Sequence, residues 1–390
     1  MHYLERPTKI QFELSNVCNA LCSSCVRNKI DWDILKVLMD NNEKIDITNL
    51  PMKVRDEIGS PQYLTKEVFT NALSGADSVK EIYFCGTIDD PLAHEDLIGI
   101  TEHVYNIRPN MFIGAHTNGS IRTPKYLKRW AEVLKDKEHF VWFSIDGLED
   151  TNHLYRKNCQ WDKIMANAKA FIEAGGKAGW QYLIFPWNAH QEQKAKELAH
   201  NMGFKRFRSR VNKSPLLNDV PSYIVKERKK IQKLRSSGVT FQEPEIPDEP
   251  IECAWKNELE QYHVSYNGRV WPCCYLNSTK MDRSDMLKER VDGNYGNTWN
   301  SLYTHSWNDI LAHEFYTRDL VSSWDSKLHG SRPGDRIYRC TEVCTKKVAF
   351  KGANFTESTD FKTGKIVVQE ANKEIAKIRE NDWKQGKRSY

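Results

Sequence analysis

The chain has no long apolar run. Across its 390 residues no segment approaches the roughly 20 apolar residues that a membrane-spanning helix needs. The first residues, MHYLERPTKIQFEL, lack the apolar core of a secretion signal. These two absences predict a cytoplasmic protein that makes no membrane contact.

Charge of one sign is also scarce. The 57 Lys and Arg side chains exceed the 52 Asp and Glu side chains by five, so the formal net charge is +5. So slight an excess permits an anionic partner without arguing for one, and nucleic acid is not an expected partner. A mixed, solvated surface is the simpler interpretation.

Several familiar catalytic motifs are missing from the sequence. It has no P-loop, no His-Glu-x-x-His helix, no Rossmann fingerprint and no Gly-x-Ser-x-Gly elbow. It does contain ten cysteines. In a reducing compartment cysteines rarely form disulfides, so their spacing is better interpreted as metal binding or catalysis.

Strand-like and helix-like segments alternate between residues 9 and 208. The expected strands lie at 9–14, 81–85, 111–117, 139–145, 179–185 and 205–208. The expected helices lie at 65–73, 94–107, 124–135, 161–174 and 189–202. Repeated strand–helix units of about 30 residues predict right-handed crossovers and a parallel sheet. Six units are too few for a closed eight-stranded barrel, so we expect an α/β fold with a partial, TIM-like (β/α)6 barrel.

The character of the sequence changes after residue 210. We expect a barrel over residues 1–215, a helix and Pro/Glu-rich linker over 216–252, and a small α+β domain over 253–350. A charged tail, helical at its end, should follow over 351–390. Residues 28–62 fit the alternation poorly and are expected to form an insertion. Within the small domain, Asn267-Gly268 predicts a tight β-hairpin turn.

Three cysteines follow the first expected strand. Cys18, Cys22 and Cys25 form a C-x3-C-x2-C pattern on one loop. Three thiolates can bind three irons of a 4Fe–4S cluster and leave the fourth iron open to a substrate or cofactor. The alternative is a zinc knuckle whose fourth ligand comes from elsewhere, such as Cys85.

This loop resembles the signature of the radical S-adenosylmethionine (SAM) enzymes. The resemblance implies that SAM chelates the open iron and is cleaved to a 5′-deoxyadenosyl radical, which abstracts a hydrogen atom from a substrate. Asn19, Leu21 and Arg27 are also typical of the signature. Ser24 departs from it, because that position is usually aromatic or hydrophobic.

Residues after the next strands match further motifs of the family in the expected order. In FCGTIDDP, Gly86, Thr87 and Asp90 match a turn that contacts the SAM amino group, and Asp89 replaces a usual glycine. The T-N-G motif at 117–119 implies that Asn118 lies on the cofactor side. The remaining matches imply that Ser144 and Asp146 lie near the SAM ribose and that Arg156 reaches the SAM carboxylate.

A second set of cysteines occurs in the C-terminal third. It consists of Cys253, Cys273, Cys340 and Cys344. The spacing and the hairpin HVSYNGRVWPCC resemble the auxiliary-cluster modules called SPASM and twitch, of which the single-cluster twitch arrangement fits better. The resemblance implies a second 4Fe–4S cluster that carries electrons. A four-thiolate zinc site is the alternative, and Cys274 competes with Cys273 as a ligand.

The three other cysteines, Cys85, Cys159 and Cys274, have the simpler interpretation of small buried side chains. Cys85 adjoins the expected cofactor turn, so it is also a candidate catalytic hydrogen-atom donor.

Taken together, these resemblances predict an oxidoreductase-type radical SAM enzyme. We expect a peptide or protein side chain as substrate, oxidised or cross-linked, and a flavodoxin or ferredoxin as electron donor. The alternatives are dehydrogenation of a small polar molecule such as an aminosugar, cleavage of SAM as the substrate itself, and a non-enzymatic zinc-binding module that uses basic stretches such as KRFRSR at 205–210.

Overall fold

The computed structural model describes residues 3–22, 25, 60–211, 250–277, 291–327, 333–344 and 357–368. Most of the expected insertion, most of the helix and linker expected over 216–252, and the last part of the tail lie outside these ranges. None of the helices within them is long and apolar enough to cross a membrane.

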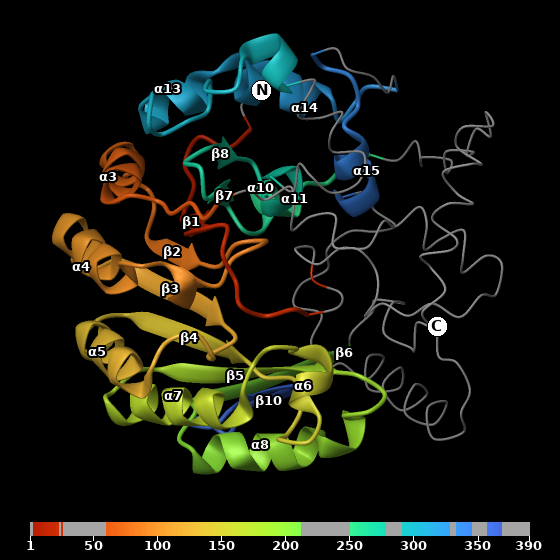
Figure 1. Ribbon diagram of the computed structural model, residues 1–390. Coiled ribbons are helices and arrows are strands. Elements are labelled where there is room, and N and C mark those ends of the chain that lie inside the picture. The colour runs from red at the N-terminus through yellow and green to blue at the C-terminus, as the bar shows by residue number, and fades with distance from the viewer. Residues whose placement is uncertain are drawn as a thin grey trace.

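Six parallel strands form the centre of one twisted sheet (Figure 1). Each strand pairs in parallel with its neighbour in sequence, in the spatial order β6-β5-β4-β3-β2-β1. The expected α/β fold with a partial six-stranded barrel is therefore confirmed. The strands are β1 (Lys9–Phe12), β2 (Glu81–Phe84), β3 (Phe112–Thr117), β4 (His139–Ser144), β5 (Ala178–Ile184) and β6 (Arg206–Val211).

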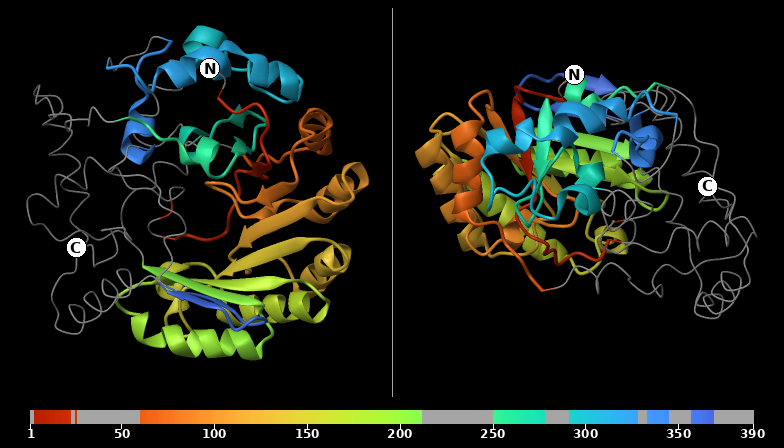
Figure 2. Two further views of the ribbon diagram at one scale, coloured as in Figure 1. Left: turned by 180° about the vertical axis from the view of Figure 1, so that it is seen from behind. Right: turned by 90° about the horizontal axis from the view of Figure 1, so that it is seen from above.

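Helices cover the outer face of this sheet (Figures 1 and 2). They are α3 (Lys66–Gly75), α4 (Leu97–Ile107), α5 (Pro124–Leu134), α7 (Trp161–Glu173) and α8 (Glu192–Asn201). Short helical turns η3 (Pro91–Ala93), α6 (Asn152–Tyr155) and η4 (Ala189–Gln191) lie in the connections. Helix α5 starts as predicted, because the Thr123 hydroxyl accepts the Tyr126 N–H and Pro124 occupies the first helical position.

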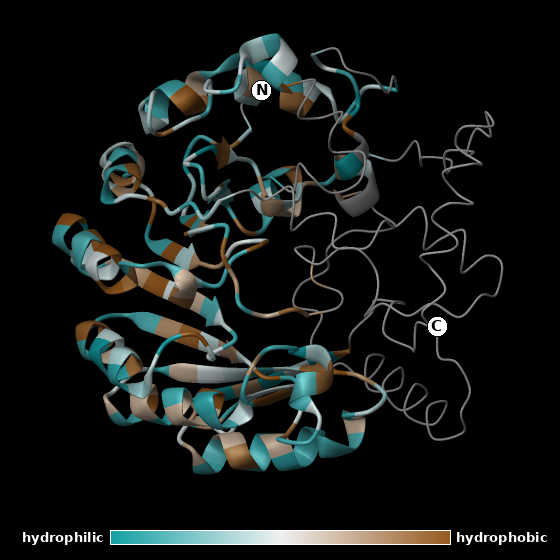
Figure 3. Cartoon of the chain, in the orientation of Figure 1, coloured by the Kyte–Doolittle hydropathy of each residue, from teal (hydrophilic) through white to brown (hydrophobic). Residues whose placement is uncertain are grey.

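The two faces of the strands differ in chemistry. Ile10, Phe12, Ile82 and Phe84 point outward toward the helices and are fully buried. Figure 3 shows this apolar character along the strands and on the helices packed against them. The alternate positions face the inside of the barrel and carry polar or aromatic side chains, as expected for a period of two residues. The barrel interior is therefore where a polar ligand can bind.

The C-terminal third joins the same sheet. Strand β7 (Gln261–Val264) pairs in parallel with β1, and β8 (Val270–Trp271) pairs with β7 through the predicted hairpin, in which Gly268 has φ of +75°. The module expected over 253–350 is thus a continuation of the barrel sheet at its β1 edge. Its remaining elements are α10 (Ala254–Asn257), α11 (Cys274–Asn277), α13 (Trp307–Ala312), the π-helical turn η6 (Phe315–Asp319), α14 (Leu320–Ser322) and α15 (Tyr338–Cys344).

The segment expected to be a charged tail contributes two further strands. Strand β9 (Glu357–Asp360) pairs antiparallel with β6, and β10 (Ile366–Val368) pairs with β9. The Asp360 carboxylate accepts the N–H groups of Lys362 and Thr363, each at 3.0 Å, and so builds the turn between them. The sequence interpretation missed β9, whose sequence ESTD is polar, and β10, whose apolar run IVV is only three residues long.

Candidate functional site

The first cysteine loop lies at the carboxyl end of β1. The Cys25 N–H donates to the Cys22 carbonyl at 3.1 Å, which forms a turn between the two cysteines. The Leu21 N–H donates to the Lys157 carbonyl at 2.9 Å and fixes the loop to the segment after α6. The carboxyl ends of parallel barrel strands are the usual place for cofactor chemistry.

Two side-chain donors approach the sulfur atoms of this loop. Asn118 Nδ2 lies 3.7 Å from Cys18 Sγ, and Arg156 Nη1 lies 3.7 Å from Cys22 Sγ. Burial raises the pKa of Cys22 to about 12, and the Arg156 guanidinium opposes this shift. The thiols of Cys18 and Cys25 also interact electrostatically with each other. The three cysteines are thus gathered at one place, with N–H donors that favour thiolate sulfur.

Arg156 and Asp146, both predicted SAM contacts, lie against each other. Arg156 Nε donates to Asp146 Oδ2 at 2.6 Å, and the Asp146 side chain is fully buried. The other carboxylate oxygen accepts the Leu183 N–H at 2.7 Å. Asp146 therefore orients the guanidinium that reaches Cys22. Their contacts with SAM, and that of the buried Ser144 nearby, stay predictions.

The Asp90 carboxylate accepts three hydrogen bonds from neighbouring groups of the protein. It accepts the Thr117 hydroxyl at 2.8 Å, the Asn118 N–H at 2.7 Å and the Leu92 N–H at 3.0 Å. These bonds join the turn after β2 to the turn after β3. Asp90 thereby positions Asn118, whose amide reaches Cys18.

Two buried carboxylates shape the turn after β2. Asp89 accepts the N–H groups of Gly86 and Leu14, each at 2.8 Å, and Glu13 accepts those of Thr87 at 2.6 Å and Ile88 at 3.0 Å. A Cβ at Gly86 would collide with both carboxylate side chains, so glycine is required there. Predicted cofactor residues Gly86 and Thr87 are therefore held by Glu13 and Asp89.

Glu13 was not a candidate from the sequence. It is 1% exposed, and burial raises its pKa despite the N–H groups that it accepts. Burial and the Glu13 carboxylate likewise raise the pKa of Asp89. The available signal was an acidic residue at an inward-facing position directly after β1. Such a residue has to be paired or protonated inside a protein.

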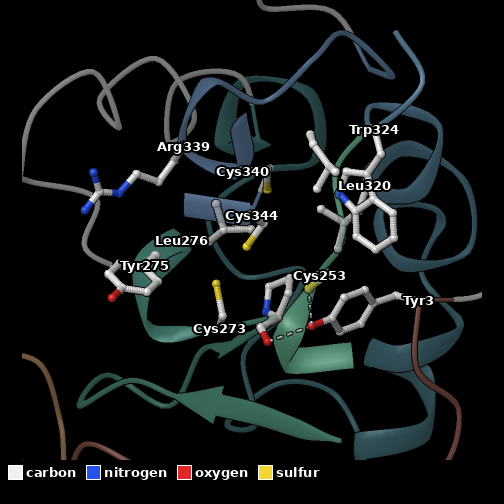
Figure 4. Close-up of a pocket in the computed structure, with 12 residues that line it drawn as sticks. Tyr3, Cys253, Cys273, Tyr275, Leu276, Leu320, Trp324, Arg339, Cys340 and Cys344 are labelled. Atoms are coloured by element: carbon white, nitrogen blue, oxygen red, sulfur yellow. Dashed lines mark hydrogen bonds between the residues drawn. The ribbon is translucent and has the colours of Figure 1, made fainter. Parts of the chain in front are cut away.

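The second set of cysteines lines a single pocket (Figure 4). Cys253, Cys273 and the pair Cys340 and Cys344 of α15 come from three separate segments, and their sulfur atoms lie around a shared space. Tyr3 closes one side: its hydroxyl donates to the Pro272 carbonyl at 3.0 Å and lies 3.7 Å from Cys253 Sγ. In the described residues no group of three or more His, Cys, Asp or Glu side chains is arranged to hold a metal ion as it stands.

Cys273 and Cys274 lie in different surroundings. Cys273 lines the pocket of the second set, whereas Cys274 is absent from the lining. The electrostatic neighbours of Cys274 include Glu13, and Cys274 is in turn a neighbour of Cys85. Cys274 therefore faces the barrel with Cys85, and Cys273 is the one grouped with the other three cysteines.

The inner wall of the barrel carries a cluster that the sequence interpretation also missed. The Arg208 guanidinium lies 3.9 Å from the ring centre of Trp142 and donates from Nε to Gln181 Oε1 at 2.9 Å. The His116 ring stacks beside Trp142, with centroids 6.5 Å apart. The signal was again a period of two residues: polar side chains alternating with buried apolar ones in β3 to β6.

Comparison with known proteins gives matches of structure only. No protein-family model and no curated protein matches the sequence. Streptococcus suis SuiB bound to the precursor peptide SuiA aligns with 12% identity and a TM-score of 0.49, over 83% of this chain and 68% of SuiB. With SuiB bound to S-adenosylmethionine, the alignment covers 72% of this chain and 65% of that one, so the chain spans just under two thirds of that structure.

Two other solved structures align with 14% identity. The structure of anSMEcpe with bound AdoMet has a TM-score of 0.45, over 80% of this chain and 81% of its own. The structure of BtrN in complex with AdoMet and 2-DOIA has a TM-score of 0.36, and the alignment covers 80% of this chain and 84% of BtrN. All three proteins have been solved with S-adenosylmethionine (AdoMet) bound.

Proposed function

We propose that this protein is a radical SAM enzyme whose Cys18, Cys22 and Cys25 hold a 4Fe–4S cluster. The observation that carries the proposal is the gathering of three thiols after β1, with Asn118 and Arg156 each donating toward a sulfur at 3.7 Å. Three ligands on one loop suit a cluster with one open iron. When bound, the cluster and SAM supply a 5′-deoxyadenosyl radical that abstracts a hydrogen atom from the substrate.

The protein's own residues would hold and shield this chemistry. Arg156 and Asn118 offer N–H groups to the cluster sulfurs, which in iron–sulfur proteins tune the potential. The turn at 86–88 is fixed by Glu13 and Asp89. The buried Thr87 hydroxyl oxygen has no hydrogen-bond partner among the described residues, so it is available to the SAM amino group.

We further propose that Cys253, Cys273, Cys340 and Cys344 hold a second 4Fe–4S cluster, as in a twitch-like module. The support is a shared pocket lined by four thiols, which suits complete coordination of a cluster. Such a cluster would carry an electron from the substrate, so the net reaction would be an oxidation or a cross-link. A flavodoxin or ferredoxin in a reducing, cytoplasmic compartment would supply the reducing electron. None of the ten cysteines, all of them described, forms a disulfide.

The substrate that we propose is a peptide or protein side chain. The support is the barrel interior, whose aromatic and polar lining offers stacking and hydrogen bonds to a side chain inserted from a longer ligand. A small polar molecule is the alternative outcome, and mass spectrometry of the modified product would separate the two.

The test compares C22A with C159A in anaerobically purified protein. Cys159 is buried and lies near Cys22 but is not a proposed ligand, so it is a matched control. With SAM and dithionite, the parent and C159A should form 5′-deoxyadenosine, and C22A should form none. Formation of this product by C22A at the parental rate would contradict the proposal. Circular dichroism would verify that both variants are folded.

A further inference from the structure

The basic stretch at 205–210, KRFRSR, lies almost entirely in β6. The alternation of the strand places Arg206, Arg208 and Arg210 on the inner face of the sheet, while Phe207 and Ser209 are 0% exposed on the opposite face. The proposed cluster chemistry assigns no role to these three arginines. Their positive charges need an explanation, because like charges on one face of a strand repel.

Arg206 is neutralised within the protein. Its Nε donates to Asp360 Oδ2 at 3.0 Å, across the β6–β9 pairing. Its guanidinium also lies 5.1 Å from the ring centre of Phe140. Arg206 is therefore a structural residue that joins the tail hairpin to the barrel.

Arg208 has no such counter-ion. No carboxylate of the described residues pairs with it, and its hydrogen bonds go from Nε and Nη2 to the single acceptor Gln181 Oε1. A guanidinium has five N–H donors. Two of them donate to Gln181, so three N–H groups on Nη1 and Nη2 have no acceptor among the described residues. Trp142 supports one face of the guanidinium at 3.9 Å. The remaining end has the geometry that binds a carboxylate or phosphate bidentately.

The surroundings of Arg208 make an added anion favourable. The guanidinium is partly buried, and its strongest electrostatic interaction is with a second cation, the exposed Arg210. Burial and Arg210 lower the pKa of Arg208 to about 10, so it is still charged at neutral pH. Burial and Arg208 lower the pKa of His116 to about 3, so this ring is neutral. Arg208 thus has no acidic partner among the described residues, whereas Asp146 is an electrostatic neighbour of Arg210.

We propose that Arg208, assisted by Arg210, binds an oxyanion of the substrate, a carboxylate or a phosphate, inside the barrel. The anion would meet the free end of the Arg208 guanidinium, with Trp142 and Gln181 holding that guanidinium in place. This proposal rests on the proposed function and narrows its substrate to one with an anionic group. It also explains the basic stretch without a nucleic acid partner, since one of its arginines is already paired with Asp360.

The test measures anion binding to the reconstituted holoprotein by isothermal titration calorimetry. The probes are benzoate, a planar carboxylate, and inorganic phosphate. R208Q should weaken binding of the preferred probe by at least about tenfold, because the charge and the fork are both lost. R208K keeps the charge and should weaken binding less. R206Q is the matched control and should bind as the parent does. The probe that binds more tightly shows whether the site prefers a carboxylate or a phosphate.

Three results would overturn the proposal. One is binding of neither probe by the parent at millimolar concentration, and another is parental binding by R208Q. The third concerns the SAM carboxylate: if R208Q weakens SAM binding and benzoate displaces SAM, the cationic site belongs to the cofactor. R208K covers the case in which R208Q does not fold. Failure of the proposed function is a separate result, namely absence of 5′-deoxyadenosine with anion binding intact.

Discussion

The two sets of cysteines are assembled in different ways. Cys18, Cys22 and Cys25 belong to one loop, and their spacing alone brings them together after β1. The pocket of Cys253, Cys273, Cys340 and Cys344 is built from the residue before α10, the end of the β8 hairpin and helix α15. The first set needs only the folding of its own loop. A dispersed set exists only when the C-terminal segments have packed against the barrel.

The sharpest way to test this comparison uses two adjacent cysteines. C273A should lose the second cluster, about four irons per chain, while C274A should keep it, because only Cys273 lines the pocket. Iron and sulfide analysis of the purified variants measures this directly. Equal loss of iron in the two variants would contradict the assignment of Cys273, and not Cys274, as the cluster ligand.

A smaller effect is expected at the base of the first loop. R156Q would leave the fully buried Asp146 without its ion-pair partner and should lower the free energy of unfolding by about 3–5 kcal/mol. Denaturant unfolding of the cluster-free protein would measure it. R129Q removes an exposed ion pair to Glu102 and should cost less than about 1 kcal/mol. Similar losses in both variants would argue against a special role for the buried pair.

The smallest effect concerns the Glu13–Asp89 pair. Because the pKa of Asp89 is raised in the folded state, the folded protein keeps a proton that the unfolded chain releases first. The contribution of Asp89 to stability should therefore be greatest in acid and fall as the pH rises above the usual pKa of an aspartate, about 4. In D89N this decline should be flatter, as judged by melting temperatures across that range. D77N, at an 88% exposed site, should follow the parent. A parallel decline in D89N and the parent would contradict the assignment.

The sequence was sufficient to predict the six strands, the helices between them and the first cysteine loop, because each depends on local periodicity or spacing. The sequence could not distinguish Cys273 from Cys274 as the cysteine of the second set. The two residues are adjacent, and only the folded backbone determines which side chain points into the pocket. Glu13 and Arg208 were missed for a related reason. A charged residue in a strand is informative only once the inner face of the barrel is known.

The most direct test of the central claim is the iron, sulfide and zinc content of anaerobically purified protein, with its visible spectrum. The account predicts about eight irons in the parent and about four in a Cys18/Cys22/Cys25→Ala triple variant, since each 4Fe–4S cluster holds four. The variant should keep the spectrum of the second cluster. Zinc in place of iron in the parent would contradict both cluster assignments and the radical chemistry built on them.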